Sequence, residues 1–362
     1  MSNRILILLP NDQLGGAEQH LMNVANYYLQ RDFYVEVRFL TQEKTGAWRR
    51  LRGNLNLIFT NAKAEKNGIV KFFRNIISNN NKVYDFVYTS HVHLTSFAGL
   101  MIKFKFIKVE NFIARESTSI FKRFSGRKLA FFRFLYKVGY SKVSLLICQT
   151  EFMKNQLISA LPHLDEKINI VVIPNPINLA SIYHGEIDSS LLDTNFIVSA
   201  GRLIPEKGFD ILIKAFSILK NRGMNMKLVI LGEGNLRDDL TQLAVDLGVF
   251  DDVKLLGFQS NVYPYFRKAK ACVVSSIIEG FPNVLLQMMS QNEKVISTLC
   301  AGGIEDIPRI STCVVGDSSE LAMNIENTLM NDTLGNREIF DSFLEERSIT
   351  NFISKINIHL NA

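Results

Sequence analysis

The chain has 362 residues, of which 47% are hydrophobic and 21% are charged, as expected of a folded protein with two domains. It contains no run of roughly 18 apolar residues, which excludes a transmembrane helix of ordinary length. Its net charge of +6 is uneven, because residues 1–190 carry 25 Lys and Arg against 14 Asp and Glu, while the remainder is mildly acidic.

Strand-like and helix-like segments alternate through the first half of the chain. An apolar run at 4–10 predicts a first strand, and not a signal peptide, because polar residues follow it without a small-residue cleavage site. A helical pattern follows it at 17–30, and another helix is expected to begin at Glu151. Further strands are predicted at 34–40, 84–90, 112–115, 144–150 and 168–176. This order predicts a parallel sheet with helices on both faces.

The same pattern starts again after a polar stretch that follows residue 178, which we interpret as a linker. Strands are predicted at 196–201, 227–231, 253–257, 271–276, 294–298 and 312–315, with helices at 209–223 and 236–249. We therefore expect an α/β protein with two doubly wound Rossmann-like domains facing a cleft. The expected domains are 1–178 and 179–345, and a further helix is expected in 346–362.

The stretch from Gly201 to Gly208, GRLIPEKG, leaves a predicted strand and enters a predicted helix. The helix N-terminus offers N–H groups and the positive end of a dipole to an anion, and the glycines permit close approach. Arg202 and Lys207 add two positive charges at that place, so the combination suits a diphosphate. An ordinary strand–turn–helix corner with two surface cations is the alternative.

Other loops follow strands at the same predicted edge. Gly232 and Gly234 form a second glycine-rich turn, and AGGIE at 301–305 forms a further one. Glu279 lies in a turn fixed by Gly280 and Pro282, where its carboxylate can accept hydrogen bonds from sugar hydroxyls. A helix N-terminal charge that complements the dipole is the alternative interpretation of Glu279.

Taken together, GRLIPEKG, LGEG, SSIIEGFPNVLL and GGIE resemble the donor-binding signature of the family 4 retaining glycosyltransferases of GT-B fold. The type resembled builds bacterial cell-envelope polysaccharides. In the first half, Gly15-Gly16-Ala17-Glu18 is similar to the N-terminal loop of that family, and IPNPIN is similar to its linker entrance. The resemblance covers most of the chain and is most specific at about 195–310. It implies that 1–178 is the acceptor-side domain, that 179–345 binds the nucleotide sugar, and that a helix in 346–362 crosses back to the first domain.

The resemblance implies catalytic roles for Arg202 and Lys207, which would hold the donor diphosphate and stabilise the departing charge, and for Glu279, which would bind the transferred sugar. It implies a UDP- or GDP-linked sugar donor, no metal and no other cofactor, and no protein nucleophile. The other implied donor contacts are Gly15, Gly16, Gly201, Gly232, Phe258, Phe281, Pro282, Asn283 and Gln287.

The sequence departs from the family at two places. Gln287 stands where the family has a second glutamate that meets the ribose hydroxyls, so the contact here has no charge. The family often has a histidine in the first domain near the donor sugar. We expect Arg115 and Glu116, in a predicted loop, to occupy that region and contact acceptor or donor, and we interpret His91 and His93 as uninvolved loop residues.

Residues 99–142 form a basic and aromatic segment. It holds eleven Lys and Arg against Glu110 and Glu116, and ten Phe and Tyr are interleaved with them. The part at 128–140 is predicted to be a helix, and basic amphipathic helices with aromatic residues bind anionic membrane surfaces. A core helix with a solvated rim is the alternative. No nucleic-acid motif is present, so nucleic acid is not an expected partner.

We therefore expect a retaining, metal-independent glycosyltransferase that moves a sugar from a nucleotide sugar to a lipid-linked or cell-envelope glycan acceptor. Four cysteines without a CxxC pair favour reduced thiols, so a cytoplasmic protein, peripheral on the inner face of the cell membrane, is expected. Two alternatives stay open. A nucleotide-sugar epimerase would not need the basic segment, and a non-catalytic nucleotide-sugar-binding partner subunit would be consistent with Gln287.

Overall fold

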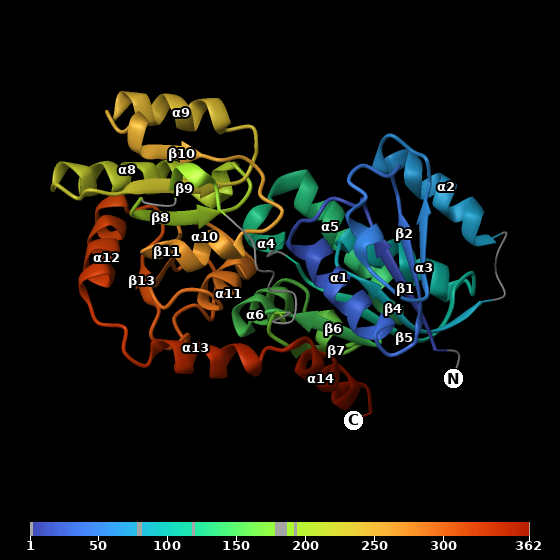
Figure 1. Ribbon diagram of the computed structural model, residues 1–362. Coiled ribbons are helices and arrows are strands. Elements are labelled where there is room, and N and C mark those ends of the chain that lie inside the picture. The colour runs from blue at the N-terminus through green and yellow to red at the C-terminus, as the bar shows by residue number, and fades with distance from the viewer. Residues whose placement is uncertain (1–2, 78–81, 118–119, 178–186, 192–193, 362) are drawn as a thin grey trace. The chain divides into compact units, whose positions relative to one another are not determined.

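The computed structural model describes residues 3–77, 82–117, 120–177, 187–191 and 194–361 (Figure 1). The chain divides into two compact units, Met1–Pro176 with Ile349–Ala362 (unit 1) and Ile177–Ser348 (unit 2). The expected linker begins in 178–186, which lies outside the described residues. Within the described ranges, no helix is both long and apolar enough to cross a membrane.

Unit 1 is built on a seven-stranded parallel sheet in the order β3-β2-β1-β4-β5-β6-β7. The order therefore reverses between β1 and β4. Strand β3 is absent from the sequence prediction, because it lies at the sheet edge and its residues are all half-buried, without alternation. The strands are β1 (Arg4–Leu9), β2 (Tyr34–Phe39), β3 (Leu55–Phe59), β4 (Val83–Thr89), β5 (Lys108–Arg115), β6 (Leu145–Cys148) and β7 (Asn169–Val172).

Helices cover both faces of this sheet, because alternate residues of each strand point to opposite sides. In β1, Leu6 and Leu8 join one apolar cluster, whereas Ile5 and Ile7 join the cluster on the other face. The helices of unit 1 are α1 (Gly16–Leu29), α2 (Glu65–Ile77), α3 (Val92–Lys103), α4 (Ile120–Arg123), α5 (Gly126–Gly139), α6 (Glu151–Ala160), α7 (Pro162–Asp165) and α14 (Ile349–Asn361). Short 3₁₀ turns are η1 (Ala47–Arg50) and η2 (Tyr140–Lys142).

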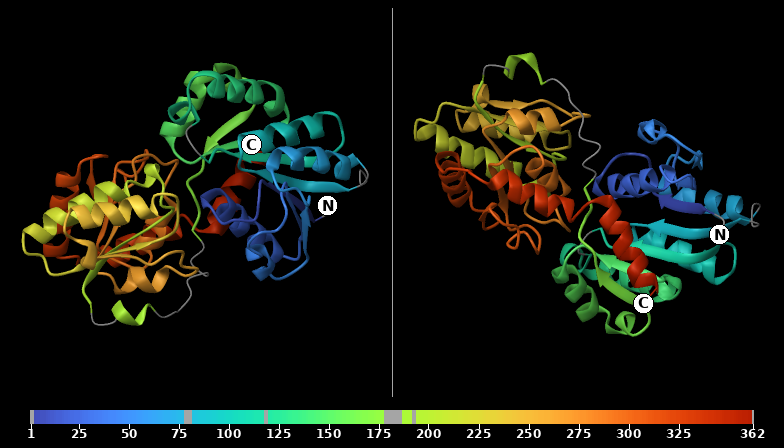
Figure 2. Two further views of the ribbon diagram at one scale, coloured as in Figure 1. Left: turned by 90° about the horizontal axis from the view of Figure 1, so that it is seen from above. Right: turned by 60° about the horizontal axis from the view of Figure 1, so that its bottom comes forward.

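Helix α14 belongs to unit 1 although it is the last element of the chain (Figure 2). Its residues Phe352, Ile353 and Ile356 are buried in the cluster that α1 and β1 also form. The ring of Phe352 packs edge-on against His20 of α1, with 5.0 Å between centroids. The apolar face of α14 therefore completes one layer of helices over the first sheet.

Unit 2 contains a six-stranded parallel sheet in the order β10-β9-β8-β11-β12-β13, so its order reverses between β8 and β11. The strands are β8 (Phe196–Ala200), β9 (Lys227–Leu231), β10 (Val253–Leu255), β11 (Ala271–Val274), β12 (Val295–Thr298) and β13 (Ser311–Cys313). All six strands predicted in this part of the chain are present, and four of them are predicted one or two residues too long at their carboxyl ends.

Two layers of helices cover the second sheet. Helices α8 (Phe209–Asn221), α9 (Arg237–Asp246) and α12 (Ser318–Met330) bury one face, and α8 and α9 lie together in Figure 1. Helices α10 (Tyr263–Lys268), α11 (Asn283–Met289) and α13 (Asn336–Glu345) bury the other. The 3₁₀ turns are η4 (Ser189–Leu191), η5 (Pro205–Lys207) and η6 (Phe250–Asp252). Both units are thus doubly wound, and ligand sites in such sheets form at the carboxyl ends of strands where the order reverses.

Candidate active site

Two loops of unit 2 join at the carboxyl edge where the strand order reverses. The loop after β8 carries Lys207, and the loop after β11 carries Ser275 and Ile277. Ser275 Oγ donates a hydrogen bond to the Lys207 carbonyl at 3.0 Å, and the Ile277 N–H donates to the Glu206 carbonyl at 2.8 Å. These bonds hold the two loops in fixed register across the reversal.

Two glycines make this junction possible. Gly208 has φ +60°, and a Cβ there would lie 2.2 Å from the Ser275 carbonyl oxygen. Gly232, after β9, has φ +150°, and a Cβ there would lie 1.8 Å from the carbonyl oxygen of Gly201. A side chain at either position would both clash with backbone and strain the chain, so the glycine-rich pattern of the sequence has a direct steric cause.

The ammonium of Lys207 and the carboxylate of Glu279 form an ion pair at this junction. The same Glu279 oxygen accepts a hydrogen bond from Ser276 Oγ at 3.1 Å, and the Glu279 N–H donates to the Cys300 carbonyl at 2.9 Å. Each of the two side chains is 18% exposed, so the pair is largely withdrawn from water but reachable. An ammonium has three N–H donors, so Lys207 can donate to a bound anion while it remains paired with Glu279.

The structure brings Gly201, Lys207 and Glu279 together, since the aliphatic stem of Lys207 passes beside the Gly201 backbone. The remaining predicted donor residues are spread along the same loops. Arg202 is exposed, and Phe258 is 70% exposed after β10.

The predicted residues around α11 divide between the core and the surface. Phe281 is buried in the core of unit 2, so its ring is structural and only its backbone lies in the loop. Pro282 caps α11, Asn283 begins it, and Gln287 is half-buried one turn further along.

The corresponding edge of unit 1 gathers ionisable side chains that the sequence pattern did not bring together. Gly15 caps α1, and Glu18 in its first turn lies with Oε1 3.3 Å from Nε2 of His91, the residue that caps α3 after β4. His91, interpreted from the sequence as an uninvolved loop residue, thus caps a helix and contacts Glu18. The GGAE motif and a histidine directly after a strand were the available signals.

Arg115 is the last residue of β5, in agreement with the strand predicted at 112–115, and it is almost completely buried, so the expectation that it also belongs to a loop is wrong. Its Nη2 donates to Asn175 Oδ1 at 2.5 Å, while Nε and Nη1 are buried without a hydrogen-bond partner. Burial lowers the pKa of Arg115 to about 10, and the nearby carboxylates of Glu116 and Glu18 oppose that effect. A buried cation with unpartnered donors is costly, so a polar or anionic ligand there would be stabilised.

Glu116 is also buried, and its carboxylate is turned into unit 1. Tyr136 and Tyr140 donate hydrogen bonds to its two oxygens at 2.8 and 3.3 Å, and its carbonyl accepts one from Gln149 Nε2 at 2.8 Å. Burial raises the pKa of Glu116 to about 7, although the two hydroxyls and Arg115 lower it in part. The expectation that the Glu116 side chain contacts donor or acceptor is therefore corrected. Its carboxylate instead binds Tyr136 of α5 and so connects this helix to the end of β5.

Among the residues that the structure describes, no group of three or more His, Cys, Asp or Glu side chains is arranged to hold a metal ion. The cationic side chains described above at the two edges are Lys207 in unit 2 and Arg115 in unit 1.

Comparison with known proteins gives the same two-part division. The family model for glycosyl transferases group 1 matches residues 187–332, and that for glycosyltransferase family 4 matches residues 14–181.

Individual curated relatives match about half of the chain. One from Campylobacter jejuni is 33% identical over 175 residues, which are 48% of this chain and 47% of that protein; it is the N-acetylgalactosamine-N,N'-diacetylbacillosaminyl-diphospho-undecaprenol 4-alpha-N-acetylgalactosaminyltransferase. The lipopolysaccharide core biosynthesis glycosyltransferase LpsE of Rhizobium meliloti is 32% identical over 158 residues, 42% and 45% of the two chains. The chain spans about half the length of the curated relatives it matches.

Solved structures share the fold over almost the whole chain. HepE of Anabaena in complex with UDP and glucose superposes with a TM-score of 0.80 at 20% identity, covering 99% of both chains. The apo form of WaaB, a lipopolysaccharide outer core galactosyltransferase, gives a TM-score of 0.68 at 18% identity, again over 99% of both. The expected architecture of two doubly wound α/β domains, the GT-B fold, is thereby confirmed.

We predict that the stability of unit 1 depends on pH through Glu116. Because its pKa is raised from 4.5 to about 7, its neutral form stabilises the fold below about pH 4.5, and this contribution is lost as pH rises through 7. Relative to Glu116→Gln, which is neutral throughout, the wild type should lose about 3 kcal/mol of unfolding free energy between pH 4.5 and pH 8. Urea unfolding followed by the fluorescence of Trp48, the single tryptophan and buried in unit 1, measures this.

Glu110→Gln, at an exposed position of the same strand, is the matched control for removing a carboxylate. A constant difference between wild type and Glu116→Gln over this pH range would contradict the assignment of a buried, neutral Glu116.

Proposed function

The chain belongs to the glycosyltransferases of group 1 and family 4, and we propose that it transfers a sugar from a nucleotide sugar to a lipid-linked or cell-envelope glycan. The observation that carries this proposal is the Lys207–Glu279 pair at the edge where the strand order of unit 2 reverses. It puts a cation for a diphosphate beside a carboxylate for sugar hydroxyls. The relatives named above transfer sugars to undecaprenyl-diphosphate-linked and lipopolysaccharide acceptors according to their names, which supports this acceptor class.

In the proposed reaction, the bond between the anomeric carbon and the donor diphosphate breaks, and a bond from the acceptor oxygen to the same face of that carbon forms. The acceptor proton passes to a diphosphate oxygen, so no protein nucleophile and no metal are needed. Lys207 and the exposed Arg202 stabilise the charge that grows on the leaving diphosphate. Glu279, held by Ser276 and by its own N–H, orients the sugar.

The edge of unit 1 is proposed to bind the remaining polar groups of donor or acceptor. Arg115 has two buried nitrogens without a partner, which suits a charged or hydroxyl-rich ligand. Glu116 acts as a positioning residue, because its carboxylate contacts Tyr136 and Tyr140 and not the loop surface. Gly15 and Gly16, at the start of α1, lie at the same carboxyl edge and are proposed to approach the donor phosphate.

We predict that Lys207→Ala weakens binding of UDP, the nucleotide present in the HepE structures and the first probe to use. Loss of a charge-assisted hydrogen bond of about 1.5–3 kcal/mol corresponds to a dissociation constant roughly 10- to 150-fold higher. Calorimetric titration of UDP and GDP into the full chain measures this and identifies the nucleotide. Lys214→Ala is the matched control, because Lys214 lies on α8 and pairs with exposed Asp210 at 3.2 Å. Unchanged UDP and GDP affinity in Lys207→Ala would remove the diphosphate assignment.

Gln287 decides between an active transferase and a non-catalytic nucleotide-sugar-binding subunit. We predict that Gln287→Glu changes the turnover of sugar transfer by less than about tenfold, because an amide already hydrogen-bonds ribose hydroxyls and a charge adds about 1 kcal/mol. Gln242→Glu, on α9, controls for the added charge. A wild type without measurable transfer that becomes active on Gln287→Glu would favour the non-catalytic subunit.

We further propose that unit 1 docks on the anionic inner face of the cell membrane through α5. Phe131 and Phe134 are 56% and 58% exposed, and they lie on one helix face with Arg127 and Lys137. Phe121, Phe124 and Phe132 of the same segment pack on the core, so only part of its aromatic content is available. Exposed aromatic rings with flanking cations are the combination that binds an anionic interface.

We predict that the double variant Phe131→Ser/Phe134→Ser partitions onto phosphatidylglycerol vesicles at least about tenfold less than wild type, since burying one Phe contributes about 1.5–3 kcal/mol. Co-sedimentation with vesicles measures this. Phe250→Ser, on η6 of unit 2, is the matched control, because Phe250 is 50% exposed. Equal sedimentation of the double variant and wild type would assign these rings no membrane role.

A further inference from the structure

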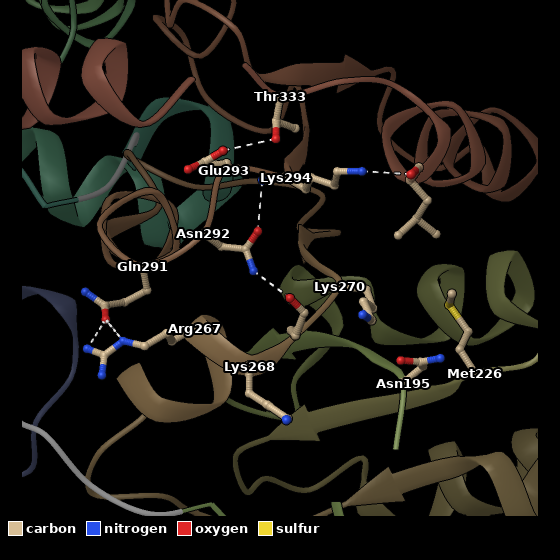
Figure 3. Close-up of a pocket in the computed structure, with 12 residues that line it drawn as sticks. Asn195, Met226, Arg267, Lys268, Lys270, Gln291, Asn292, Glu293, Lys294 and Thr333 are labelled. Atoms are coloured by element: carbon tan, nitrogen blue, oxygen red, sulfur yellow. Dashed lines mark hydrogen bonds between the residues drawn. The ribbon is translucent and has the colours of Figure 1, made fainter. Parts of the chain in front are cut away.

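A pocket of 610 Å³ lies at the amino edge of the sheet of unit 2 (Figure 3). Four of its lining residues immediately precede four parallel strands: Asn195 before β8, Met226 before β9, Lys270 before β11 and Lys294 before β12. Parallel strands begin at one edge of a sheet and end at the other. The pocket is therefore separated from Lys207 and Glu279 by the length of the strands.

The pocket concentrates positive charge in a unit that is otherwise acidic. Residues 177–348 hold 15 Lys and Arg against 23 Asp and Glu, yet Arg267, Lys268, Lys270 and Lys294 all line this one pocket. Among the described lining residues, Glu293 is the one carboxylate, and its Oε2 accepts a hydrogen bond from Thr333 at 3.0 Å. Such a local excess of one sign attracts a ligand of the other.

Buried hydrogen bonds hold the segments that carry these cations. The buried side chain of Asn292 donates to the carbonyls of Phe266 and Ala269 at 2.7 and 2.8 Å, and accepts from the Lys294 N–H at 2.9 Å. Arg267 donates through Nε and Nη2 to Gln291 Oε1 at 3.1 and 2.6 Å. The loop at 266–270 is therefore fixed against the turn at 291–294, as the dashed lines of Figure 3 show.

The lysines that line this pocket have N–H donors that are not used within the protein. Within the described part of the chain, the side chains of Lys268 and Lys270 form no ion pair and no hydrogen bond, and both residues are exposed. Lys294 Nζ donates to the Leu329 carbonyl at 2.7 Å, which uses one of its three N–H groups. Three ammonium groups around one hollow repel each other until an anion is bound.

We propose that this amino-edge pocket binds a multiply charged, phosphate-bearing anion of at least diphosphate size. The volume exceeds what one phosphate needs, and several lysine donors around a polar hollow match phosphate oxygens. Lys268 and Lys270 contact the anion, and Asn292 and Gln291 hold the loops that present them. This site is distinct from the donor site, because it lies at the opposite edge of the same sheet.

Inorganic pyrophosphate titrated into the full chain at low ionic strength, followed by calorimetry, tests the proposal. We expect Lys268→Gln/Lys270→Gln to weaken binding at least about tenfold, since each lost contact to a charged group weakens affinity by about that factor. Lys214→Gln/Lys254→Gln removes the same charge elsewhere on unit 2 and should change affinity less than about twofold. All titrations are repeated in a Lys207→Ala background, which removes the contribution of the donor site.

A second arm distinguishes a free anion from a lipid headgroup. Pyrophosphate binding lost in the pocket variant and kept in the charge control identifies a soluble phosphate ligand. Binding to cardiolipin vesicles, whose headgroup carries two phosphates, that falls in the pocket variant in a Phe131→Ser/Phe134→Ser background, without pyrophosphate binding, identifies a lipid headgroup in the same pocket. The proposal would be overturned if wild type and pocket variant bound both probes equally, or if neither probe bound. It would also be overturned if the charge control lost as much binding as the pocket variant. Circular dichroism confirms that each variant is folded.

Discussion

The approach of the Gly208 backbone to the Ser275 carbonyl is the constraint on which the candidate donor site depends. No side chain fits between them, since a Cβ on Gly208 would lie 2.2 Å from that oxygen. The contact lets Ser275 Oγ and the Ile277 N–H bond the carbonyls of Lys207 and Glu206. Those bonds fix the loop after β8 against the loop after β11, and the Lys207–Glu279 pair joins the same two loops.

The charged residues of the two candidate edges differ in how deeply they are buried, although both units have the same architecture. In unit 2 the cation and carboxylate of the site are paired and partly exposed, so a ligand can compete for them at modest cost. In unit 1, Arg115 and Glu116 are buried. Burial lowers the pKa of Arg115 and raises that of Glu116, and both changes favour the neutral form. The unit 1 edge is therefore a preorganised but costly arrangement, held by Asn175 and by the hydroxyls of Tyr136 and Tyr140.

Unit 2 carries cations at both ends of its strands although its overall charge is negative. Lys207 follows β8, while Lys270 and Lys294 precede β11 and β12. Parallel topology requires this separation, because residues before and after a strand lie at opposite edges of the sheet. A doubly wound unit can thus present two separate cationic surfaces, and side-chain hydrogen bonds to backbone carbonyls help to hold each of them.

The sequence by itself determined the alternation of strands and helices, the division into two doubly wound parts and the glycine-rich loops that end strands, because these follow from local hydrophobic period and from turn chemistry. It also identified Lys207 and Glu279, which lie in those loops. Only the tertiary structure decided which of these residues meet: Lys207 and Glu279 are 72 positions apart, and strand order brings them together. It also decided that Arg115 and Glu116 are buried, that Glu18 lies beside His91, and that four basic residues share one pocket. Burial and long-range contact depend on how strands far apart in the chain are ordered in the sheet, and no local pattern encodes that order.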